Sequence, residues 1–422
     1  MIRLLILADD FTGALDTAVQ FAQQGAKTLV TTSPDAVTRF MESGAEVVSV
    51  DLETRHLPPD RAREIVRAAA GYAAAVGIPY LYKKLDSTLR GNVGCELEAV
   101  LEAFPGRDLM LAPAFPKAGR TVRDGVLYVG GVPLSETAFA KDPFNPILSS
   151  DIREIIRQTS GVPVVVEGGP GAPEGEAAVH LYDAETDEAL RRLGDALEAS
   201  GGLRLTAGSA GFAAVLAEKI AFEKGRRQPC LPKGKTLIVC GSVHPVSLRQ
   251  IEAASSQVPV FTLPEGLNEA ASLMETPEGA RLLRDISGAL DQGSCAAVRS
   301  VRDTSQLRKT PPEEAGVRSK NVADNLGALT KALLEHNDIG LIVVFGGDTL
   351  HGIMARIGCD TLEPVVEILP GTAVSRLREC GYPGYVATKA GGFGGEDLIE
   401  AILRWRERAS VGREEENREA IP

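Results

Sequence analysis

The stretch LADDFTGALD, residues 7–16, decides the fold class of the N-terminal half. It follows an apolar run, residues 2–7, that is typical of a buried strand, and it leads into a segment typical of a helix. Two adjacent aspartates, Asp9 and Asp10, stand where the strand is expected to stop. A carboxylate at the end of a buried strand is costly unless something pairs with it. Either these acids cap the following helix, or they face a ligand.

Strand-like and helix-like segments alternate along both halves of the chain. Strand-like runs are KTLVTT, EVVSVDLE, PYLYKKLD and DLMLAPAF in the first half, and TLIVCGS, LIVVFGGDT and YVATK in the second. Helix-like segments follow most of them, including 93–104 and 245–254. This alternation predicts an α/β fold in which mainly parallel sheets are flanked by helices. Ligands of such sheets bind at the carboxyl ends of the strands.

The chain is too long for one ordinary hydrophobic core, because it has 422 residues, so two domains are expected. The polar, proline- and glycine-bearing segment AFEKGRRQPCLPKGK, 221–235, predicts the boundary between them. We therefore place an N-terminal domain at 1–228 and a C-terminal domain at 229–422. The charged, proline-containing segment 300–319 is expected to be a loop.

Composition and charge exclude several classes of function. The formal net charge of −12 argues against a nucleic-acid partner, because phosphate backbones call for a basic face. The six cysteines form no CxxC pair and no cluster with histidine, which indicates a reducing compartment and argues against structural zinc. The N-terminus reads as a strand rather than a signal peptide, and no apolar run approaches about 18 residues. We expect a cytoplasmic protein with no membrane partner.

Small-residue turns follow three strand-like runs of the second half. GGDT, 346–349, ends one run and begins a helix-like segment, where free amide groups favour phosphate. The loop KAGGFGG, 389–395, contains four glycines introduced by a lysine, and Gly241-Ser242 ends a third run. Taken singly, GGDT is as well explained as a tight turn in which Asp348 or Thr349 caps the helix. Three such turns at three strand ends favour a nucleotide site.

In the first half, the segment KKLDSTLRGN, 83–92, gathers cations, an acid and hydroxyl-binding side chains within ten residues. Lysine and arginine bind a carboxylate or a transferring phosphoryl group. Asp86 could accept a hydroxyl proton, Ser87 and Asn92 could bind hydroxyls, and Arg55 is another candidate anion contact. Alternatively, the segment 83–92 is a solvated polar turn without a ligand. APAFPKAGRTVRDG, 112–125, is either an ordered loop beside a ligand or a surface connection.

The two halves together supply the parts of one reaction. Acids, hydroxyl binders and cations lie in the first half, and glycine loops suited to phosphates lie in the second. This division fits transfer of a phosphoryl group from a nucleotide to a small hydroxylated acid, which is mostly positioning and charge neutralisation. An active site in the cleft between the two domains would close on the substrate and exclude water.

Five motifs, LADDFTGALD, KKLDSTLRGN, APAFPKAGR, FGGDT and TKAGGFG, together resemble the four-carbon acid sugar kinases. They occur in the family's order over nearly the whole chain. The family includes kinases for threonate, erythronate and 3-oxo-tetronate. The resemblance implies an N-terminal substrate domain, a C-terminal ATP domain and phosphorylation of the 4-hydroxyl of a four-carbon sugar acid.

The resemblance implies substrate contacts at Asp10, Arg55 and 84–87, and nucleotide contacts at Ser242, one glycine of 346–347 and the loop 390–393. The other residues named below are expected from the motifs themselves. The expected substrate-binding residues are Asp10, Arg55, Lys84, Leu85, Asp86, Ser87 and Arg90. The expected nucleotide-binding residues are Ser242, Gly346, Gly347, Asp348, Thr349, Lys389, Ala390, Gly391, Gly392, Phe393 and Gly394. Asp10 and Asp86 are both candidate general bases, with Lys84 or Arg90 balancing charge and Mg²⁺ bridging the phosphates of ATP; the metal ligands themselves are not assigned. The segment CGSVH, 240–244, departs from the Ser-Gly-Ser and small residues that the family favours.

Two other functions are compatible with these features. The chain could be a kinase for another small sugar acid, such as glycerate, because the same loops would serve. It could also be a two-domain sensor that binds a sugar acid or a nucleotide without turnover. The size is compatible with a homodimer.

Overall fold

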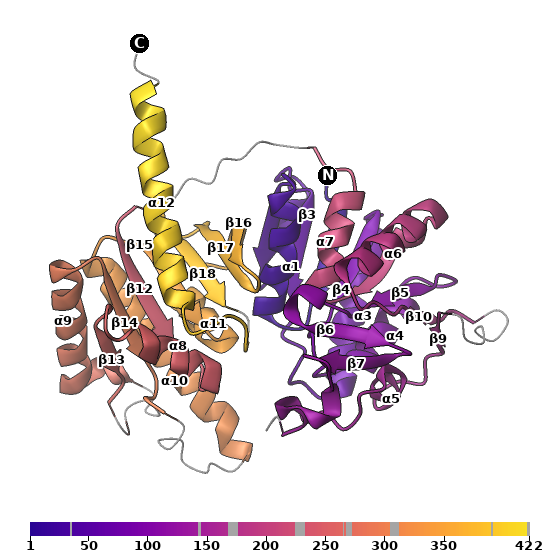
Figure 1. Ribbon diagram of the computed structural model, residues 1–422, viewed down its shortest axis with the longest axis horizontal. Coiled ribbons are helices and arrows are strands. Elements are labelled where there is room, and N and C mark those ends of the chain that lie inside the picture. The colour runs from indigo at the N-terminus through magenta and orange to yellow at the C-terminus, as the bar shows by residue number, and fades with distance from the viewer. Residues whose placement is uncertain are drawn as a thin grey trace. The chain divides into compact units, whose positions relative to one another are not determined.

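The computed structural model describes residues 1–33, 36–141, 145–167, 176–223, 233–264, 266, 272–303, 312–389 and 391–419. The chain divides into two compact units, Met1–Arg227 and Gln228–Pro422 (Figure 1). The expected boundary at 228/229 and the predicted nucleotide-binding residue Ala390 both lie outside the described residues.

A parallel sheet forms the centre of the N-terminal unit. Its strands lie in the order β2, β3, β1, β4, β11, β5, β10, β9, and each neighbouring pair is parallel. Their bounds, in this order, are Thr28–Thr31, Val47–Asp51, Leu4–Ala8, Tyr80–Lys84, Leu205–Gly208, Leu109–Ala112, Val179–Leu181 and Val164–Val166. A separate antiparallel sheet contains β6 (Arg120–Arg123), β7 (Val126–Val129) and β8 (Val132–Pro133).

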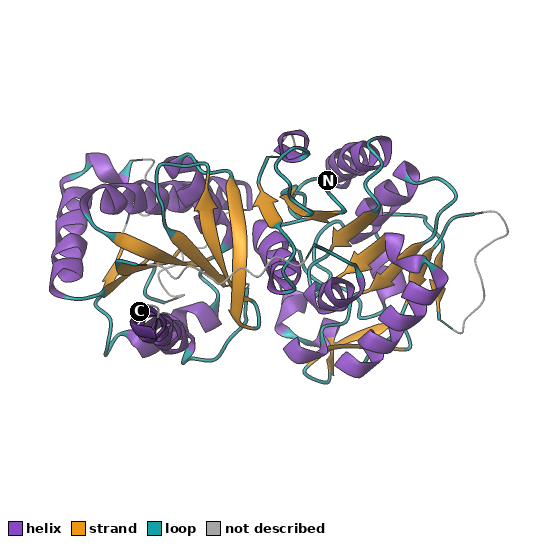
Figure 2. Cartoon of the chain, turned by 90° about the horizontal axis from the view of Figure 1, so that it is seen from above, coloured by secondary structure: helices purple, strands orange, loops and turns teal. Residues whose placement is uncertain are grey.

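Helices cover both faces of this sheet (Figure 2). α1 packs on α7 and α7 on α6, whereas α3 packs on α4 and α4 on α5, so the two sets form two layers. The helices are α1 (Phe11–Gln23), α2 (Ala36–Phe40), α3 (Pro59–Ala75), α4 (Val93–Ala103), α5 (Ile152–Arg157), α6 (Asp187–Ser200) and α7 (Ala210–Lys219). Most strands are buried because both of their faces are covered, which explains why they read as continuous apolar runs, whereas β9 at the edge of the sheet is only half-buried.

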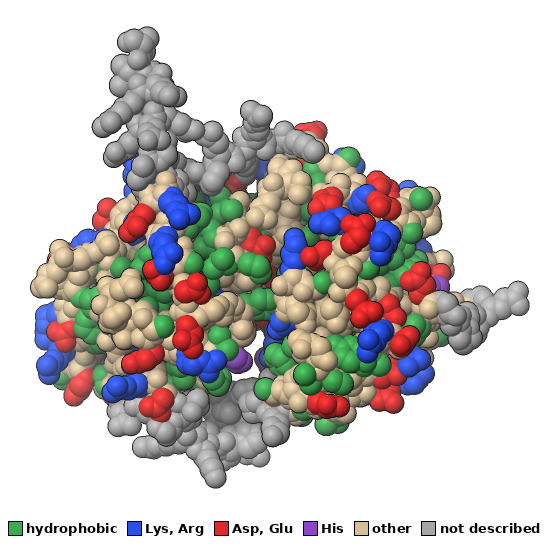
Figure 3. Space-filling model, viewed as in Figure 1, with side chains coloured by type: hydrophobic (Ala, Val, Ile, Leu, Met, Phe, Trp, Pro, Cys, Tyr) green, Lys and Arg blue, Asp and Glu red, His purple; other side chains and the backbone are tan. Residues whose placement is uncertain are grey.

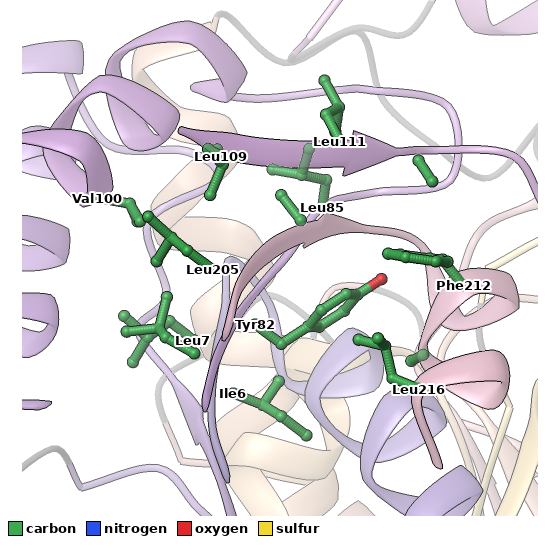
Figure 4. Close-up of a cluster of buried hydrophobic side chains, with 14 of the residues drawn as sticks. Ile6, Leu7, Tyr82, Leu85, Val100, Leu109, Leu111, Leu205, Phe212 and Leu216 are labelled. Carbon is green, nitrogen blue, oxygen red and sulfur yellow. The ribbon is translucent and has the colours of Figure 1, made fainter. Parts of the chain in front are cut away.

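Side chains from successive strand positions fill the two halves of the core (Figure 4). Ile6 and Tyr82 point towards Phe212 of α7, and the rings of Tyr82 and Phe212 have centroids 6.5 Å apart. Leu7, the next residue of β1, points to the other face, towards Val100 of α4. All five side chains are buried, and this alternation is the period of two that a strand imposes.

The C-terminal unit has a second sheet, in the order β13, β14, β12, β15, β18, β17, β16. The first five strands are parallel, and β16 and β17 form an antiparallel hairpin that pairs with β18. Their bounds, in this order, are Val260–Thr262, Cys295–Arg299, Lys235–Cys240, Ile339–Phe345, Tyr385–Lys389, Thr372–Arg378 and Thr361–Leu369.

The helices of this unit again form two layers. α10 packs on α9 and α11, and α12 packs on α8. They are α8 (Pro245–Ala254), α9 (Pro277–Gln292), α10 (Pro312–His336), α11 (Gly347–Ile357) and α12 (Leu398–Glu419). The predicted loop at 300–319 is wrong over 312–319, where α10 begins at Pro312. Proline is tolerated in the first turn of a helix, so it did not mark a loop there.

The predicted fold class, mainly parallel sheets flanked by helices, is confirmed in both units. Among the described helices, none combines the length and the apolar character needed to cross a bilayer. Acidic and basic side chains are interspersed over the surface of each unit in the view of Figure 3. The five described cysteines are free thiols.

We expect the Tyr82→Phe substitution to lower the free energy of unfolding by about 1 kcal/mol, because the buried hydroxyl donates to the Ser209 carbonyl. Urea unfolding measures the change. Tyr72→Phe is the matched control, since the Tyr72 hydroxyl bonds Thr38 at an exposed position. Equal losses in the two variants would contradict the role of the buried hydrogen bond.

Candidate active site

The carboxyl ends of neighbouring strands meet at one edge of the N-terminal sheet. Ala8 of β1 lies opposite both Asp51 of β3 and Lys84 of β4, and Lys84 lies opposite Gly208 of β11. The residues that directly follow β1 and β4 are therefore brought together by the parallel register. They include most of the residues predicted to bind substrate.

Arg55 joins the two aspartates that follow β1. Its Nε donates to Asp9 Oδ2 at 2.7 Å, and its Nη1 donates to Asp10 Oδ2 at 2.6 Å. Asp10 is also the N-cap of α1, because its Oδ1 accepts the amide of Gly13 at 2.9 Å. The hydroxyl of Thr12 donates to Asp10 Oδ2 at 2.8 Å. Asp10 therefore caps the helix and lies in an ion-pair cluster at the same time.

Arg55 also approaches Asp86, which follows β4. Its Nη2 lies 3.7 Å from Asp86 Oδ1, while Arg90 donates in a fork to both Asp86 oxygens, at 2.8 Å from Nε and 3.0 Å from Nη2. The hydroxyl of Thr88 donates to the same carboxylate. Three aspartates and two arginines thus form one cluster, which we call the Arg55 cluster: Asp9, Asp10, Arg55, Asp86 and Arg90.

The turn after Asp86 is shaped to reach Arg55. Leu89 and Gly91 both have positive φ, 55° and 88°. A Cβ at Gly91 would stand 3.1 Å from Cγ and 3.2 Å from the carbonyl oxygen of Arg55, so glycine permits this approach. Asn92 was predicted to bind a hydroxyl. Its buried amide instead donates to the carbonyls of Thr54 and Leu57, at 2.8 Å each, and so holds the loop that carries Arg55.

The cations of the cluster set its protonation states. Burial opposes the ionisation of Asp10, but Arg55 and Lys84 outweigh it and lower the pKa of that carboxyl. Burial likewise opposes ionisation of Asp86, but Arg90 and Arg55 bring its pKa well below the ordinary value. Both carboxylates are therefore ionised near neutral pH and can accept a hydrogen bond from a hydroxyl group.

The two lysines of β4 point to opposite faces of the sheet, as successive strand residues do. Lys83 forms a fully buried ion pair with Glu96 of α4, at 2.8 Å. Lys84 lies on the side of α1, with its Nζ 3.8 Å from Asp16 Oδ1, and it acts on the pKa of Asp10. Of the two, Lys84 is therefore the cation of the candidate site.

The other residues predicted for substrate binding lie in different surroundings. Leu85 is buried in the hydrophobic core, so only its backbone could contact a ligand. Ser87 is half-buried beside Asp86.

Asp51 and Arg120 were not selected as site residues from the sequence. Burial raises the pKa of Asp51 well above its ordinary value. Burial lowers the pKa of Arg120; the charge of Asp86 acts to raise this pKa, and the charge of Arg90 acts to lower it. The position of Arg120 within APAFPKAGR was the signal that could have identified it.

In the C-terminal unit, three strand ends lie side by side. Cys240 of β12 is opposite Phe345 of β15, which is opposite Lys389 of β18. The turns that follow these residues contain the predicted nucleotide-binding positions. The parallel register therefore brings 241–242, 346–349 and the described part of the 389–395 loop to one edge of the sheet.

The first two turns are packed against each other. The amides of Gly241 and Ser242 both donate to the Phe345 carbonyl, at 3.2 and 3.1 Å. A Cβ at Gly241 would stand 2.0 Å from Thr349 Oγ1, and Gly346 has φ 111°, so both positions require glycine. Thr349 is buried by this contact.

Gly347 and Asp348 open α11. Asp348 is exposed and accepts the hydroxyl of Ser319 at 2.8 Å.

Two other segments of the C-terminal unit contact the glycine loop. Gln250 of α8 donates from Nε2 to the carbonyls of Phe393, Gly394 and Gly395, at 3.1, 3.0 and 2.9 Å. The β16–β17 turn supplies the second contact, because a Cβ at Gly371 would stand 2.8 Å from the Phe393 ring.

The other two glycines of the loop differ in their surroundings. Gly392 packs close to the imidazole of His244, because a Cβ there would stand 3.1 Å from Cε1. Gly391 has φ 36° and no atom within 4 Å of where a Cβ would be.

Lys389 points into the unit rather than towards the loop. Its Nζ donates to Ser247 Oγ at 2.9 Å and lies 5.5 Å from the centroid of the Phe345 ring. The side chain is almost completely buried, and burial lowers its pKa to about 8, with Cys240 acting in the opposite direction. In this arrangement Lys389 braces α8 against β18.

We expect Gly91→Ala to destabilise the N-terminal unit by about 2 kcal/mol, because the new Cβ meets Arg55 in a left-handed conformation. Gly77→Ala is the matched control, since Gly77 has φ 74° and no atom within 4 Å of the added Cβ. Urea unfolding of both variants isolates the contact with Arg55. A loss at position 91 no larger than that at position 77 would contradict it.

We also expect Lys389 to make stability depend on pH. The folded chain releases this proton near pH 8 and the unfolded chain near 10.5, so stability rises as pH increases between these values. Relative to Lys389→Met, the free energy of unfolding of the wild type should rise by about 2 kcal/mol from pH 8 to pH 10. Parallel stability curves for the two proteins would show that the buried amine has an ordinary pKa.

Two family models match the chain, one in each unit. The model of a sugar-binding N-terminal domain matches residues 4–216, and the model of a nucleotide-binding C-terminal domain matches residues 237–399. Crystal structures of a Salmonella typhimurium protein and a Haemophilus influenzae protein share the fold, with TM-scores of 0.74 and 0.69. Each is 22% identical in sequence, and they cover 96% and 94% of this chain and 99% and 98% of their own.

Relatives of similar length are named as kinases. The D-threonate kinase of Salmonella typhimurium is 30% identical over 97% of this chain and all of its own length, and that of Bordetella bronchiseptica is 33% identical over 96% and 97%. The D-erythronate kinase of Heliobacterium modesticaldum is 27% identical over 89% of this chain and 90% of its own length. The chain therefore belongs to the four-carbon acid sugar kinase family.

Proposed function

We propose that the chain is an ATP-dependent kinase that phosphorylates the 4-hydroxyl of a four-carbon sugar acid of the threonate, erythronate or 3-oxo-tetronate class. The observation that carries this proposal is the pairing of two unlike strand-end sites in one chain. The N-terminal unit has the Arg55 cluster at its strand ends, and the C-terminal unit has glycine turns at its own. The names of relatives that match nearly the whole chain, D-threonate kinase and D-erythronate kinase, support the same reaction.

Cations at the N-terminal site match the carboxylate of a sugar acid. Arg55, Arg90 and Lys84 balance the charges of the aspartates, and Arg120 adds a guanidinium within electrostatic reach of Asp86. Burial disfavours the charge of Arg120, so an anion bound beside it would relieve that cost. Arginine also presents the planar fork that recognises carboxylates.

Asp10 is better placed than Asp86 to orient the attacking hydroxyl. The Asp10 side chain is 25% exposed against 11% for Asp86, and both oxygens of Asp86 are engaged by Arg90. Asp10 Oδ1 accepts the Gly13 amide and has a second lone pair for a substrate hydroxyl. The low pKa of Asp10 is no obstacle, since phosphoryl transfer has a loose transition state that needs positioning more than a strong base.

The turns of the C-terminal unit have features suited to nucleotide phosphates. Gly241 and Gly346 allow the two turns to pack closely at the N-terminus of α11, where the amide groups of the first turn and the helix dipole favour an anion. We assign the nucleotide to Ser242, Gly346, Gly347 and the loop at 391–394. ATP supplies the phosphoryl group, and Mg²⁺ neutralises its charge. Asp348, exposed at the start of α11, is the carboxylate that this end of the helix offers to a magnesium-bound water.

The first test is ADP release with ATP and Mg²⁺ across D- and L-threonate, D- and L-erythronate, the 3-oxo-tetronates and D-glycerate. We expect turnover on one four-carbon acid, with a product whose phosphorus couples to the two C4 protons in NMR. Fast turnover on D-glycerate alone would instead identify the other sugar-acid kinase. Ligand binding without ADP release would identify a sensor.

We expect Asp10→Asn to lower kcat by about 100-fold or more, because the hydroxyl loses its charged acceptor. Asp86→Asn should raise the KM of the acid more than it lowers kcat, because it releases Arg90. Asp60→Asn, at an exposed position in the first turn of α3, is the matched control and should leave both constants within 2-fold. Near-normal turnover of both site variants would refute the assignment of these acids.

A further inference from the structure

We propose that Gln250 is a positioning residue that sets the conformation of the glycine loop so that three successive amide groups face the phosphates of the nucleotide. This inference rests on the proposed nucleotide site. Gln250 comes from α8 and none of the sequence motifs includes it.

Gln250 contacts three successive carbonyls of the loop through a single nitrogen atom. One side-chain nitrogen lies within hydrogen-bonding distance of the carbonyl oxygens of Phe393, Gly394 and Gly395, all at 2.9–3.1 Å. The Gln250 side chain is completely buried, so these bonds form away from water. Three consecutive carbonyls are thereby turned to one side of the loop.

The orientation of these carbonyls determines the orientation of the amides. In a planar trans peptide the N–H group points opposite to the C=O group of the same unit. The described residues contain no cis peptide. The amides of Gly394, Gly395 and Glu396 therefore point away from Gln250. Because the carbonyls converge on one nitrogen, these amides lie on the outer side of the loop, where Gly394, Gly395 and Glu396 are exposed and each amide can donate to a different oxygen of a polyphosphate.

The shape of the loop is matched to this contact. Gly394 has φ 81°, and a Cβ there would stand 3.1 Å from Gln250 Nε2, so only glycine allows the approach without displacement. The Phe393 ring packs on Gly371. The loop is thus held in one conformation by a polar contact and an apolar contact.

The buried amide of Gln250 lowers the stability of the fold at one of its two polar atoms. Its Oε1 is buried and has no hydrogen-bond partner among the described residues. An unsatisfied buried acceptor costs about 1–3 kcal/mol, which an apolar side chain of the same length would avoid. The donor end of the amide is therefore the part of Gln250 that serves the loop.

The test compares Gln250→Met, which keeps the length of the side chain and removes the donor, with Asn325→Leu. Asn325 is a buried amide of the same unit that bonds the backbone amide of Leu273 rather than the loop. Its variant should lose a similar amount of thermal stability. ADP affinity by calorimetry, the KM of ATP, the KM of the sugar acid and Tm are measured for each full chain.

We expect Gln250→Met to weaken ADP binding and raise the KM of ATP by 10-fold or more, with the KM of the sugar acid within 2-fold of the wild type. Asn325→Leu should leave all three constants within 2-fold. If both variants change alike, or if Gln250→Met binds ADP normally, the inference is overturned. If Gln250→Met does not fold, Gly394→Ala tests the same contact from the loop, with the same expected loss and the same result overturning the inference.

The outcome separates this inference from the proposed function. Normal turnover by the wild type together with an unchanged KM of ATP in the variants would overturn only the role of Gln250. Failure of the wild type to turn over any acid, with the expected loss of ADP affinity in Gln250→Met, would overturn only the proposed reaction. Failure of the wild type to bind ADP or ATP would overturn both.

Discussion

The ion pairs of Arg55 are the constraint on which the N-terminal site depends. Two adjacent carboxylates at the end of a buried strand would cost several kcal/mol each if they were unpaired. Arg55 offsets this cost by bonding Asp9 and Asp10, and it can do so only because β1 and β3 are parallel neighbours in register. Gly91 and Asn92 then hold the loop of Arg55 in place. The charges that we propose to bind the substrate are thus the charges that stabilise the strand ends.

Much of this architecture follows from local sequence. Apolar runs ending in polar or glycine turns predicted β1, β4, β12, β15 and β18, and the parallel arrangement then placed their following residues at one edge of each sheet. The segment 245–254 was predicted as a helix and is one. From the sequence, Asp10 could cap the following helix or contact a ligand, and both roles were left open. The structure shows the capping bond, and the ligand contact stays a prediction.

What the sequence did not reveal depends on contacts between distant residues. Gln250 holds carbonyls that lie 143 to 145 positions away, and a glutamine on a helix otherwise reads as part of a solvated face. Asn92 looked like a hydroxyl binder because its type is polar, but its partners are the carbonyls of a loop 35 to 38 positions earlier. Lys389 looked like a phosphate ligand, whereas its amine bonds Ser247 inside the unit. The direction of a side chain at a strand end depends on neighbours that are distant in the sequence, and the local sequence pattern does not identify them.

The position of β11 has a consequence for biosynthesis. This strand is late in the chain, at Leu205–Gly208, yet it lies between β4 and β5, which are made about a hundred residues earlier. The N-terminal residues leave the ribosome first. β4 and β5 therefore cannot pair with β11, their shared neighbour in the sheet, until β11 has been synthesised. Closing a parallel sheet across so long a separation is slow, because the loop entropy is lost before the pairing is gained. The nascent unit therefore exposes two unpaired strand edges beside the future site during synthesis, and chaperone binding at that stage would protect them.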